Sequence, residues 1–354
     1  MTTPGAVKLL ALTCSSLIVA LAMGEMLLRV FGLAPTVGLV TMDERQYATL
    51  PGIFAPNQRL VERQKPKLPF TITIDSLGYR GPSFPRHKPA GEFRLVLAGD
   101  SFTFGSYVDD DKTFPSQLEG RLRSRCGKVR VINAGLGGST IPDHAQIIRR
   151  ALPLAPDLVL LTFSENDVSD LAQGSMWARL AENRRAKSRL PLSVIYPVLR
   201  HTALWHLGLA AAAVRGAGSG AAPSSPGARV TSDEASEGLR ARYRREFLAI
   251  RDTLAKRRVW FGFAVYPSHY TVSGDRPPTL VRWAMSLADS AAVPAFDFLP
   301  ALRATGLPST DLYLLPEDGH PAPRAHAAVA EDLADRLAET DLLPDRCRGI
   351  RPTP

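Results

Sequence analysis

The first residues that could do chemistry are a serine and an aspartate at the end of a short apolar run. Residues 94–98 read R-L-V-L-A, and Gly99, Asp100 and Ser101 follow them. Such a run is typical of a buried strand in a parallel sheet, where ligands bind beyond the carboxyl ends of the strands. A serine hydroxyl at that place can act as a nucleophile once a base accepts its proton. Gly, Asp and Ser also favour ordinary turns, so this interpretation needs partners elsewhere in the chain.

A histidine and an aspartate near the end of the chain have the spacing of a base and the acid that orients it. The chain has seven histidines, and His320 lies two residues after Asp318 in a loop before the last predicted helix. Residues i and i+2 of an extended segment point the same way, so both side chains can reach one site. The carboxylate would then hold the imidazole in one tautomer. His144 and His269 follow predicted strands and could line the same pocket.

Alternating strands and helices must position these side chains. From residue 93 onward, apolar strand-like runs alternate with segments that have helical periodicity, which favours parallel βαβ units. The predicted strands are 94–98, 128–133, 157–163, 259–266 and 295–298, and the predicted helices are 115–125, a helix from Pro142, 239–254, 280–291 and 322–338. We expect a three-layer α/β/α sandwich with a five-stranded, mainly parallel sheet. Ser101, Gly138 and Asn166 follow three successive strands, so they would meet at one edge.

Four sequence blocks occur in one order along this region. They are G-D-S-F at 99–102, N-A-G-L-G-G at 133–138, E-N-D at 165–167 and D-G-H-P at 318–321. The set resembles the SGNH hydrolase family of GDSL-type esterases and lipases, from about residue 93 to residue 338. The resemblance implies the flavodoxin-like SGNH hydrolase fold and a serine esterase.

The resemblance also implies a role for each block. Ser101 would attack an acyl carbonyl, His320 would act first as base and then as acid, and Asp318 would orient it. The backbone N–H groups of Ser101 and Gly138 and the side chain of Asn166 would form the oxyanion hole. Donors of this kind act on charge that develops only in the transition state.

Several positions depart from the usual family pattern. Ser164 stands where a glycine usually precedes the Asn-Asp pair, and the Asp–His spacing of the last block is one residue shorter than the common one. Glu317 occupies the alternative position for the acid, so Asp318 and Glu317 both stay open. His326, in the last predicted helix, is the alternative base. Two further aspartates of these blocks are expected to support the site: Asp100 and Asp167.

The N-terminal segment is predicted to cross or enter a membrane. Residues 9–24 carry no charge, and the apolar stretch reaches about 20 residues when it is extended past Glu25 to Leu28, which is long enough for a bilayer. Lys8 places the basic flank on the cytoplasmic side. We expect an uncleaved single-pass anchor in the cytoplasmic membrane with the catalytic domain on the periplasmic side. A signal peptide cleaved near Ala22 is the alternative, because A-L-A at 20–22 has the form of a cleavage site.

The whole chain divides into four predicted parts. Residues 1–33 are the anchor or signal, 34–92 a linker with a small β decoration, 93–346 the hydrolase-like domain, and 347–354 a tail. An insertion at about 171–232, with a Gly/Ala/Ser/Pro tract, is predicted to cap the site.

The stretch D-S-L-G-Y-R-G at 75–81 also resembles the corresponding part of membrane-anchored bacterial members of the family. Cys126 and Cys347 either form a disulfide or stay as free thiols.

Composition excludes other classes of partner. The 354 residues are 45% hydrophobic and 22% charged, with a net charge of +9. The chain has no basic stripe interleaved with aromatic residues of the kind found in nucleic-acid binders, and no His/Asp/Glu cluster with metal-ligand spacing. We therefore expect no nucleic acid, no metal and no cofactor.

The predicted function is that of an extracytoplasmic serine esterase. Its substrate would be an ester, such as an acetyl or other small acyl group on a cell-envelope glycan. Two alternatives stay open: an O-acyltransferase that uses the same triad on a polysaccharide, and a non-catalytic glycan-binding protein on the same fold.

Overall fold

A computed structural model describes residues 4–31, 50–62, 70–187, 199, 202–205, 207–208, 233–316 and 318–347. The chain divides into two compact units. The first combines Met1–Gly38 with Leu180–Ser224, and the second combines Leu39–Arg179 with Ser225–Pro354. The predicted hydrolase-like domain falls mainly in the second unit, called the catalytic unit below.

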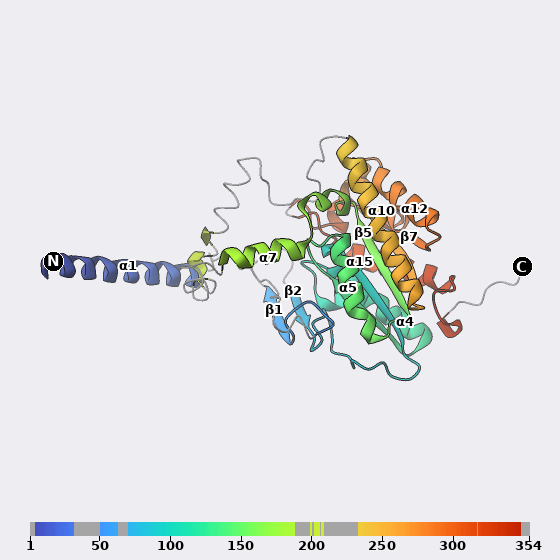
Figure 1. The fold of residues 1–354 in the computed structure, drawn as a ribbon, viewed down its shortest axis with the longest axis horizontal. Helices are drawn as coiled ribbons and strands as arrows, with labels where there is room; N and C mark the ends of the chain where they lie inside the picture. The colour runs from blue at the N-terminus through green and yellow to red at the C-terminus, as the bar shows by residue number, and fades with distance from the viewer. Residues whose placement is uncertain are drawn as a thin grey trace, which may run out of the picture. The chain divides into compact units, whose positions relative to one another are not determined.

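The centre of the catalytic unit is a parallel sheet of five strands (Figure 1). Its strands are β3 (Phe93–Gly99), β4 (Val129–Gly135), β5 (Leu158–Ser164), β6 (Trp260–Tyr266) and β7 (Ala295–Asp297). Their order across the sheet is β4-β3-β5-β6-β7, and each neighbouring pair is parallel. The five predicted strands are therefore confirmed, with β3 in the interior of the sheet. All seven residues of β3 and of β5 are buried, as expected of strands covered on both faces.

Helices cover both faces of this sheet, which confirms the predicted three-layer sandwich. Alternate side chains of β3 join two separate cores: Val96 packs on one face, and Leu95 and Leu97 pack on the other. The first face is covered by α5 (Ile141–Ala151), α10 (Asp233–Lys256) and α12 (Thr279–Ser290), and the second by α4 (Phe114–Cys126) and α15 (Pro323–Ala338). Pro142 lies in the first turn of α5, as predicted.

The remaining helices are mostly short, and one of them, α7 (Met176–Lys187), has residues in both units. They are α3 (Ser101–Phe104), α6 (Asp167–Asp170), α7 (Met176–Lys187), α11 (His269–Ser273), α13 (Leu299–Ala304) and α14 (Ser309–Leu312), together with the 3-10 turns Asp110–Lys112, Leu152–Leu154, Leu171–Gln173 and Asp345–Cys347. Several of them begin directly after a sheet strand, and these strand ends carry the site residues.

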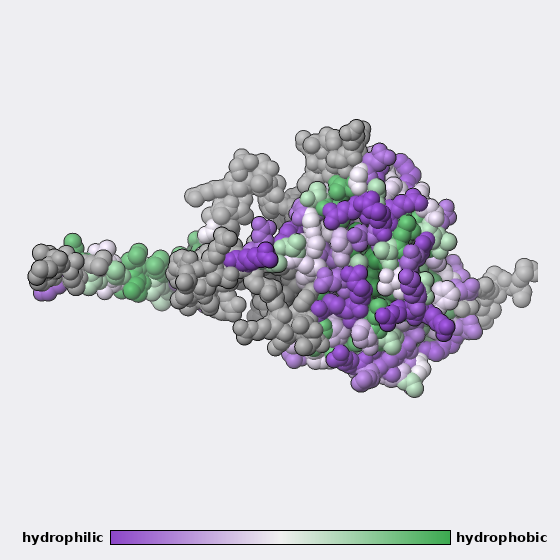
Figure 2. Space-filling view, viewed as in Figure 1, coloured by the Kyte–Doolittle hydropathy of each residue, from purple (hydrophilic) through white to green (hydrophobic). Residues whose placement is uncertain are grey.

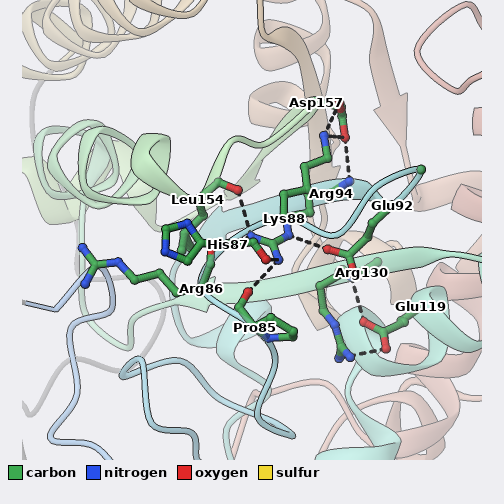
Figure 3. A network of polar contacts seen from close by, with 12 residues as sticks. Pro85, Arg86, His87, Lys88, Glu92, Arg94, Glu119, Arg130, Leu154 and Asp157 are labelled. Atoms are coloured by element: carbon green, nitrogen blue, oxygen red, sulfur yellow. Dashed lines mark hydrogen bonds and ion pairs between the residues drawn. The ribbon is translucent and has the colours of Figure 1, made fainter.

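A buried arginine, Arg94, holds the amino-terminal end of β3, which is the end away from Ser101 (Figure 3). The Arg94 guanidinium has no exposed surface. It donates to the Glu92 carboxylate and to four backbone carbonyls, those of Pro85, Arg86, His87 and Leu154. Asp157, just before β5, accepts from the Arg94 N–H and pairs with Lys88. Every charge in this network has a partner, as a buried ion pair requires, so the amino end of β3 is fixed in place.

A two-stranded hairpin lies beside the first sheet-to-helix loop. β1 (Gln58–Glu62) pairs antiparallel with β2 (Phe70–Ile74). The strand predicted at 71–75 is thus found as β2, whereas its partner β1 was not predicted. The carboxylates of Asp109 and Asp110, in the loop that follows α3, accept from the backbone N–H groups of Thr71 and Thr73 at 2.8 Å. These bonds attach the hairpin to the segment that follows Ser101.

A disulfide joins Cys126, at the end of α4, to Cys347, with 4.7 Å between their Cα atoms. Of the two possibilities for these cysteines, the structure shows the bonded one. The bond connects the end of α4 to the 3-10 turn Asp345–Cys347.

We expect the double substitution Cys126→Ser/Cys347→Ser to lower the free energy of unfolding by about 2–5 kcal/mol, because the cross-link restricts the unfolded chain. Urea unfolding of the variant and of the wild type, with and without reductant, measures the difference. Cys14→Ser is the matched control, since Cys14 is an exposed free cysteine. Equal urea midpoints for oxidised and reduced wild type would contradict this prediction.

The first unit contains one long apolar helix within the described residues, α1 (Pro4–Val30). Its segment Ala11–Val30 is long and apolar enough to span a membrane. Hydrophobic residues lie along its surface in Figure 2, and Leu12 is 70% exposed. This exposed apolar helix is what a signal anchor or a signal peptide requires.

The insertion after β5 contributes to the first unit. Glu25 of α1 accepts hydrogen bonds from the backbone N–H groups of Ala203 and Leu204 at 2.8 and 3.0 Å, and it pairs with Arg29. Residues 180–224 therefore group with the N-terminal helix. Most of the predicted cap lies outside the described residues, and its role as a cap stays a prediction.

Candidate active site

The nucleophile candidate begins a helix directly after β3. Asp100 caps α3, and its Oδ1 atom accepts from the Phe102 N–H at 2.9 Å, which makes Ser101 the first residue of the helix. A β-carbon at Gly99 would lie 2.2 Å from the Thr103 Oγ1 atom, so only glycine fits at the end of this strand. Ser101 is half-buried. The tight turn therefore presents its hydroxyl at the carboxyl edge of the sheet.

The second block runs beside this turn. The Leu136 N–H donates to the Gly99 carbonyl at 2.9 Å, and a β-carbon at Gly137 would meet the Ser101 Cβ atom at 3.7 Å. Gly138 has a φ of +72°, a left-handed conformation that favours glycine. Its carbonyl accepts from the Arg179 Nη2 atom at 2.7 Å. The structure thus places the loop that contains Gly138 next to Ser101.

The third block is tied to the first through Ser164, the residue that replaces the usual glycine. The Ser164 hydroxyl donates to the Asp100 Oδ1 atom at 3.0 Å, and its N–H donates to Asp167 at 3.3 Å. The departure from the family pattern therefore adds a hydrogen bond between two strand ends. The Asn166 Nδ2 atom donates to Asp170 at 2.8 Å, which fixes the amide of the third predicted oxyanion-hole residue.

The two supporting aspartates are buried under the site. Burial raises the pKa of Asp167 well above its usual range, and the nearby charge of Asp100 raises it further. Burial also raises the pKa of Asp100, whereas the Phe102 N–H, the neighbouring His320 and the Ser164 hydroxyl lower it. Burial and the charge of Asp100 both favour the protonated form of Asp167, because two carboxylates buried this close together repel each other when both are charged.

Asp318 and His320 form a pair in the loop before α15. The Asp318 Oδ1 atom contacts the His320 Nδ1 atom and accepts from the His320 backbone N–H at 2.9 Å. The His320 carbonyl accepts from the Leu314 N–H at 2.9 Å, which holds the loop against the chain before it. With Nδ1 on the carboxylate, the Nε2 atom is the nitrogen left to accept a proton. Glu317, the alternative acid, lies outside the described residues.

Aromatic contacts place the His320 ring at the nucleophile turn. Its centroid lies 5.6 Å from that of Phe102, the residue after Ser101, and 5.2 Å from that of Tyr107. Among the described residues no hydrogen bond joins the Ser101 hydroxyl to His320, and such bonds often form only when a substrate is bound. The structure therefore brings Ser101, Gly138, His320 and Asp318 to one edge of the sheet, with Asn166 on the adjoining strand end.

The other histidine candidates have different surroundings. His326, the alternative base, is fully buried in α15, where its Nδ1 atom accepts from the Phe114 N–H at 3.2 Å and burial lowers its pKa to about 3. His144 is also fully buried, with its Nε2 atom 2.8 Å from the Ser139 hydroxyl and its pKa lowered by burial to about 4. Neither ring lines an open pocket, so both support the fold. His269 is half-buried against Tyr270 and Tyr313.

His326 makes the stability of the catalytic unit depend on pH. Unfolded His326 binds a proton near pH 6.5, whereas folded His326 binds one only near pH 3. The unfolded state therefore holds more protons between these values, and the free energy of unfolding falls as the pH falls, by up to about 1.4 kcal/mol per pH unit. Urea unfolding at several pH values between 4.5 and 7 should show a shallower slope for His326→Gln than for the wild type. Equal slopes would contradict this assignment.

The prediction from the sequence did not include a residue that holds the loops around the site in place. Glu165 accepts from the Ser268 N–H at 2.6 Å and from the Thr271 hydroxyl at 2.8 Å, so it joins the ends of β5 and β6. The sequence feature that could have pointed to Glu165 is its position directly before Asn166. Among the residues that the structure describes, no group of three or more His, Cys, Asp or Glu side chains is placed to hold a metal ion.

This fold and site define a class of protein. A parallel α/β/α sheet with a serine after its first strand and an aspartate–histidine pair before its last helix is the architecture of the SGNH esterases. The chain belongs to the GDSL-like lipase/acylhydrolase family, whose model matches residues 97–328. It is therefore an acylhydrolase of the esterase type.

Comparison with other proteins gives only distant likenesses beyond the family. No curated protein matches the chain. An acetyl xylan esterase, AlAXEase, is 15% identical with a TM-score of 0.43, over 69% of this chain and all of that one. The acetylxylan esterase Axe2 from Geobacillus stearothermophilus is 15% identical with a TM-score of 0.41, over 72% and 98% of the two chains. The lipase/acylhydrolase from Enterococcus faecalis is 16% identical with a TM-score of 0.40, over 68% and 93%.

Proposed function

We propose that the chain is an extracytoplasmic serine esterase that removes a small acyl group, such as acetyl, from a cell-envelope glycan. The observation that carries the proposal is the Asp318–His320 pair, whose imidazole contacts the residue next to Ser101. The exposed apolar helix α1 supports attachment to a membrane, and the Cys126–Cys347 disulfide supports an oxidising compartment outside the cytoplasm. An envelope glycan is the ester-bearing polymer that such an enzyme would meet.

The mechanism follows from the site. Ser101 Oγ attacks the acyl carbonyl while His320 Nε2 takes the hydroxyl proton, and Asp318 stabilises the imidazolium that forms. The carbonyl oxygen becomes an oxyanion, which the N–H groups of Ser101 and Gly138 and the Asn166 amide would bind. His320 then gives the proton to the sugar oxygen as the ester bond breaks. Water then attacks the carbonyl carbon of the acyl-enzyme while His320 takes a proton from it, and His320 returns that proton to Ser101 Oγ as the ester bond breaks and the free acid leaves.

A fluorophosphonate tests this proposal on the full chain in detergent. The reagent phosphonylates an activated serine, so intact mass spectrometry should show one adduct on the wild type and none on Ser101→Ala. Ser106→Ala, at a serine in the turn that follows α3, is the matched control and should still be labelled. A well-folded wild type without an adduct would overturn the serine mechanism and favour the glycan-binding alternative.

Product analysis separates hydrolysis from transfer. With an acetylated glycan as donor, the esterase releases free acetate whether or not a second saccharide is present. Acetate release that falls as the saccharide is added, with the acyl group recovered on its hydroxyls, would assign the chain to the O-acyltransferases instead.

A further inference from the structure

Tyr107, close to the catalytic loop, has an unusual backbone conformation. Its φ is +66°, in the left-handed region that glycine adopts freely and bulky side chains rarely adopt. Strained residues of this kind cluster at functional sites, where the surrounding structure holds them in place. A glycine would relieve the strain, so the tyrosine side chain must have a use that outweighs it.

Arg80 holds the backbone on both sides of Tyr107. Its guanidinium is 1% exposed and lies 4.9 Å from the centre of the Phe104 ring. It donates to the carbonyls of Phe104, Gly105 and Val108 at distances between 2.5 and 2.8 Å, and to the Asp110 carboxylate at 2.9 Å. Three fixed carbonyls around one residue leave the Tyr107 backbone little freedom.

The Tyr107 ring lies between the hairpin and the proposed base. It meets the His320 imidazole edge to face, with an interplanar angle of 80° and 5.2 Å between centroids. It also contacts Phe70, the first residue of β2, at 5.9 Å and 77°. Phe102 contacts the same imidazole at 5.6 Å. The His320 ring is thus fixed by a carboxylate at Nδ1 and by two aromatic rings.

We propose that Tyr107 is a positioning residue, which holds the plane of the His320 imidazole so that Nε2 faces Ser101. The inference rests on the proposed serine mechanism and extends it to a residue outside the four family blocks. It also gives the β1–β2 hairpin and Arg80 a role in the site, because they hold the Tyr107 ring and backbone. The proposed role depends on the aromatic contact with His320, so a phenylalanine at position 107 should perform it as well as the tyrosine does.

Kinetics of Tyr107 variants test the proposal. We expect Tyr107→Leu and Tyr107→Gly to lower kcat for 4-nitrophenyl acetate, and the rate of Ser101 phosphonylation, by about 10- to 100-fold, since a misplaced catalytic group can cost about 10²-fold. KM should change less than kcat, because the ring acts through His320. Tyr107→Phe should keep both rates close to those of the wild type.

Matched controls separate positioning from folding. Ala292→Gly relieves another left-handed residue, on the exposed turn before β7, and should leave both rates unchanged. Thermal unfolding of each variant shows whether it is folded at the assay temperature. Folded Leu and Gly variants with wild-type kcat and labelling, or variants in which only KM rises, would overturn the role of Tyr107 alone. A folded wild type that takes no label would overturn the serine mechanism itself.

Discussion

Replacing Ser101 with alanine is expected to lower kcat/KM for 4-nitrophenyl acetate by at least about 10⁴-fold, because the alanine side chain cannot form the acyl-enzyme. The residual rate would come from the oxyanion donors, which the substitution leaves in place. Ester hydrolysis by the purified full chain in detergent, followed by the release of 4-nitrophenol, measures the effect.

The Ser101→Ala variant should keep its fold. Ser101 is half-buried, and among the described residues its hydroxyl has no hydrogen-bond partner, so its loss costs little stability. The thermal midpoint should therefore match that of the wild type. Ser106→Ala, at a serine in the turn that follows α3, is the control. Hydrolysis by Ser101→Ala at the wild-type rate would remove this serine from the mechanism.

The second large effect is expected from Asp318→Asn, with a fall in kcat of about 10³- to 10⁴-fold. The asparagine is nearly isosteric, but it carries no charge to stabilise the imidazolium. Its amide can also present a donor to Nδ1, which favours the tautomer with the proton on Nε2. That tautomer cannot accept the Ser101 proton. Single-turnover kinetics of the acylation step measures the loss directly.

Two other acidic residues act as controls for Asp318. Asp311 is exposed and pairs with Arg324 in the same region, so Asp311→Asn should keep wild-type kcat. Glu317→Gln tests the alternative acid. Full activity in Asp318→Asn together with a large loss in Glu317→Gln would transfer the acid role to Glu317.

The sheet could be predicted from the sequence because its strands are nearly continuous apolar runs. Residues such as those of β3 and β5 are buried on both faces, so burial leaves a clear local signal. β1 has no such signal: it reads Q-R-L-V-E, and its pairing with β2 depends on contacts outside its own sequence. A two-stranded hairpin at the margin of the unit has too few buried side chains to be recognised locally.

The residues of the candidate site that follow strands or lie in the four family blocks could be predicted from the sequence. Ser101, Gly138 and Asn166 follow strands of one parallel sheet, so topology alone brings them to one edge. The hydrogen bond from Ser164 to Asp100 depends on a substitution whose effect only the fold reveals. The left-handed turn at Tyr107 was not predictable, because no glycine marks it.

The pairing of Cys126 with Cys347 also affects how the protein is completed during synthesis. The two cysteines are 221 residues apart in sequence, so the later one is made only after all five strands of the main sheet. A chain that stops before Cys347 lacks the partner with which Cys126, at the end of α4, forms its disulfide. The cross-link therefore stabilises a sheet whose strands have all been synthesised before it can form.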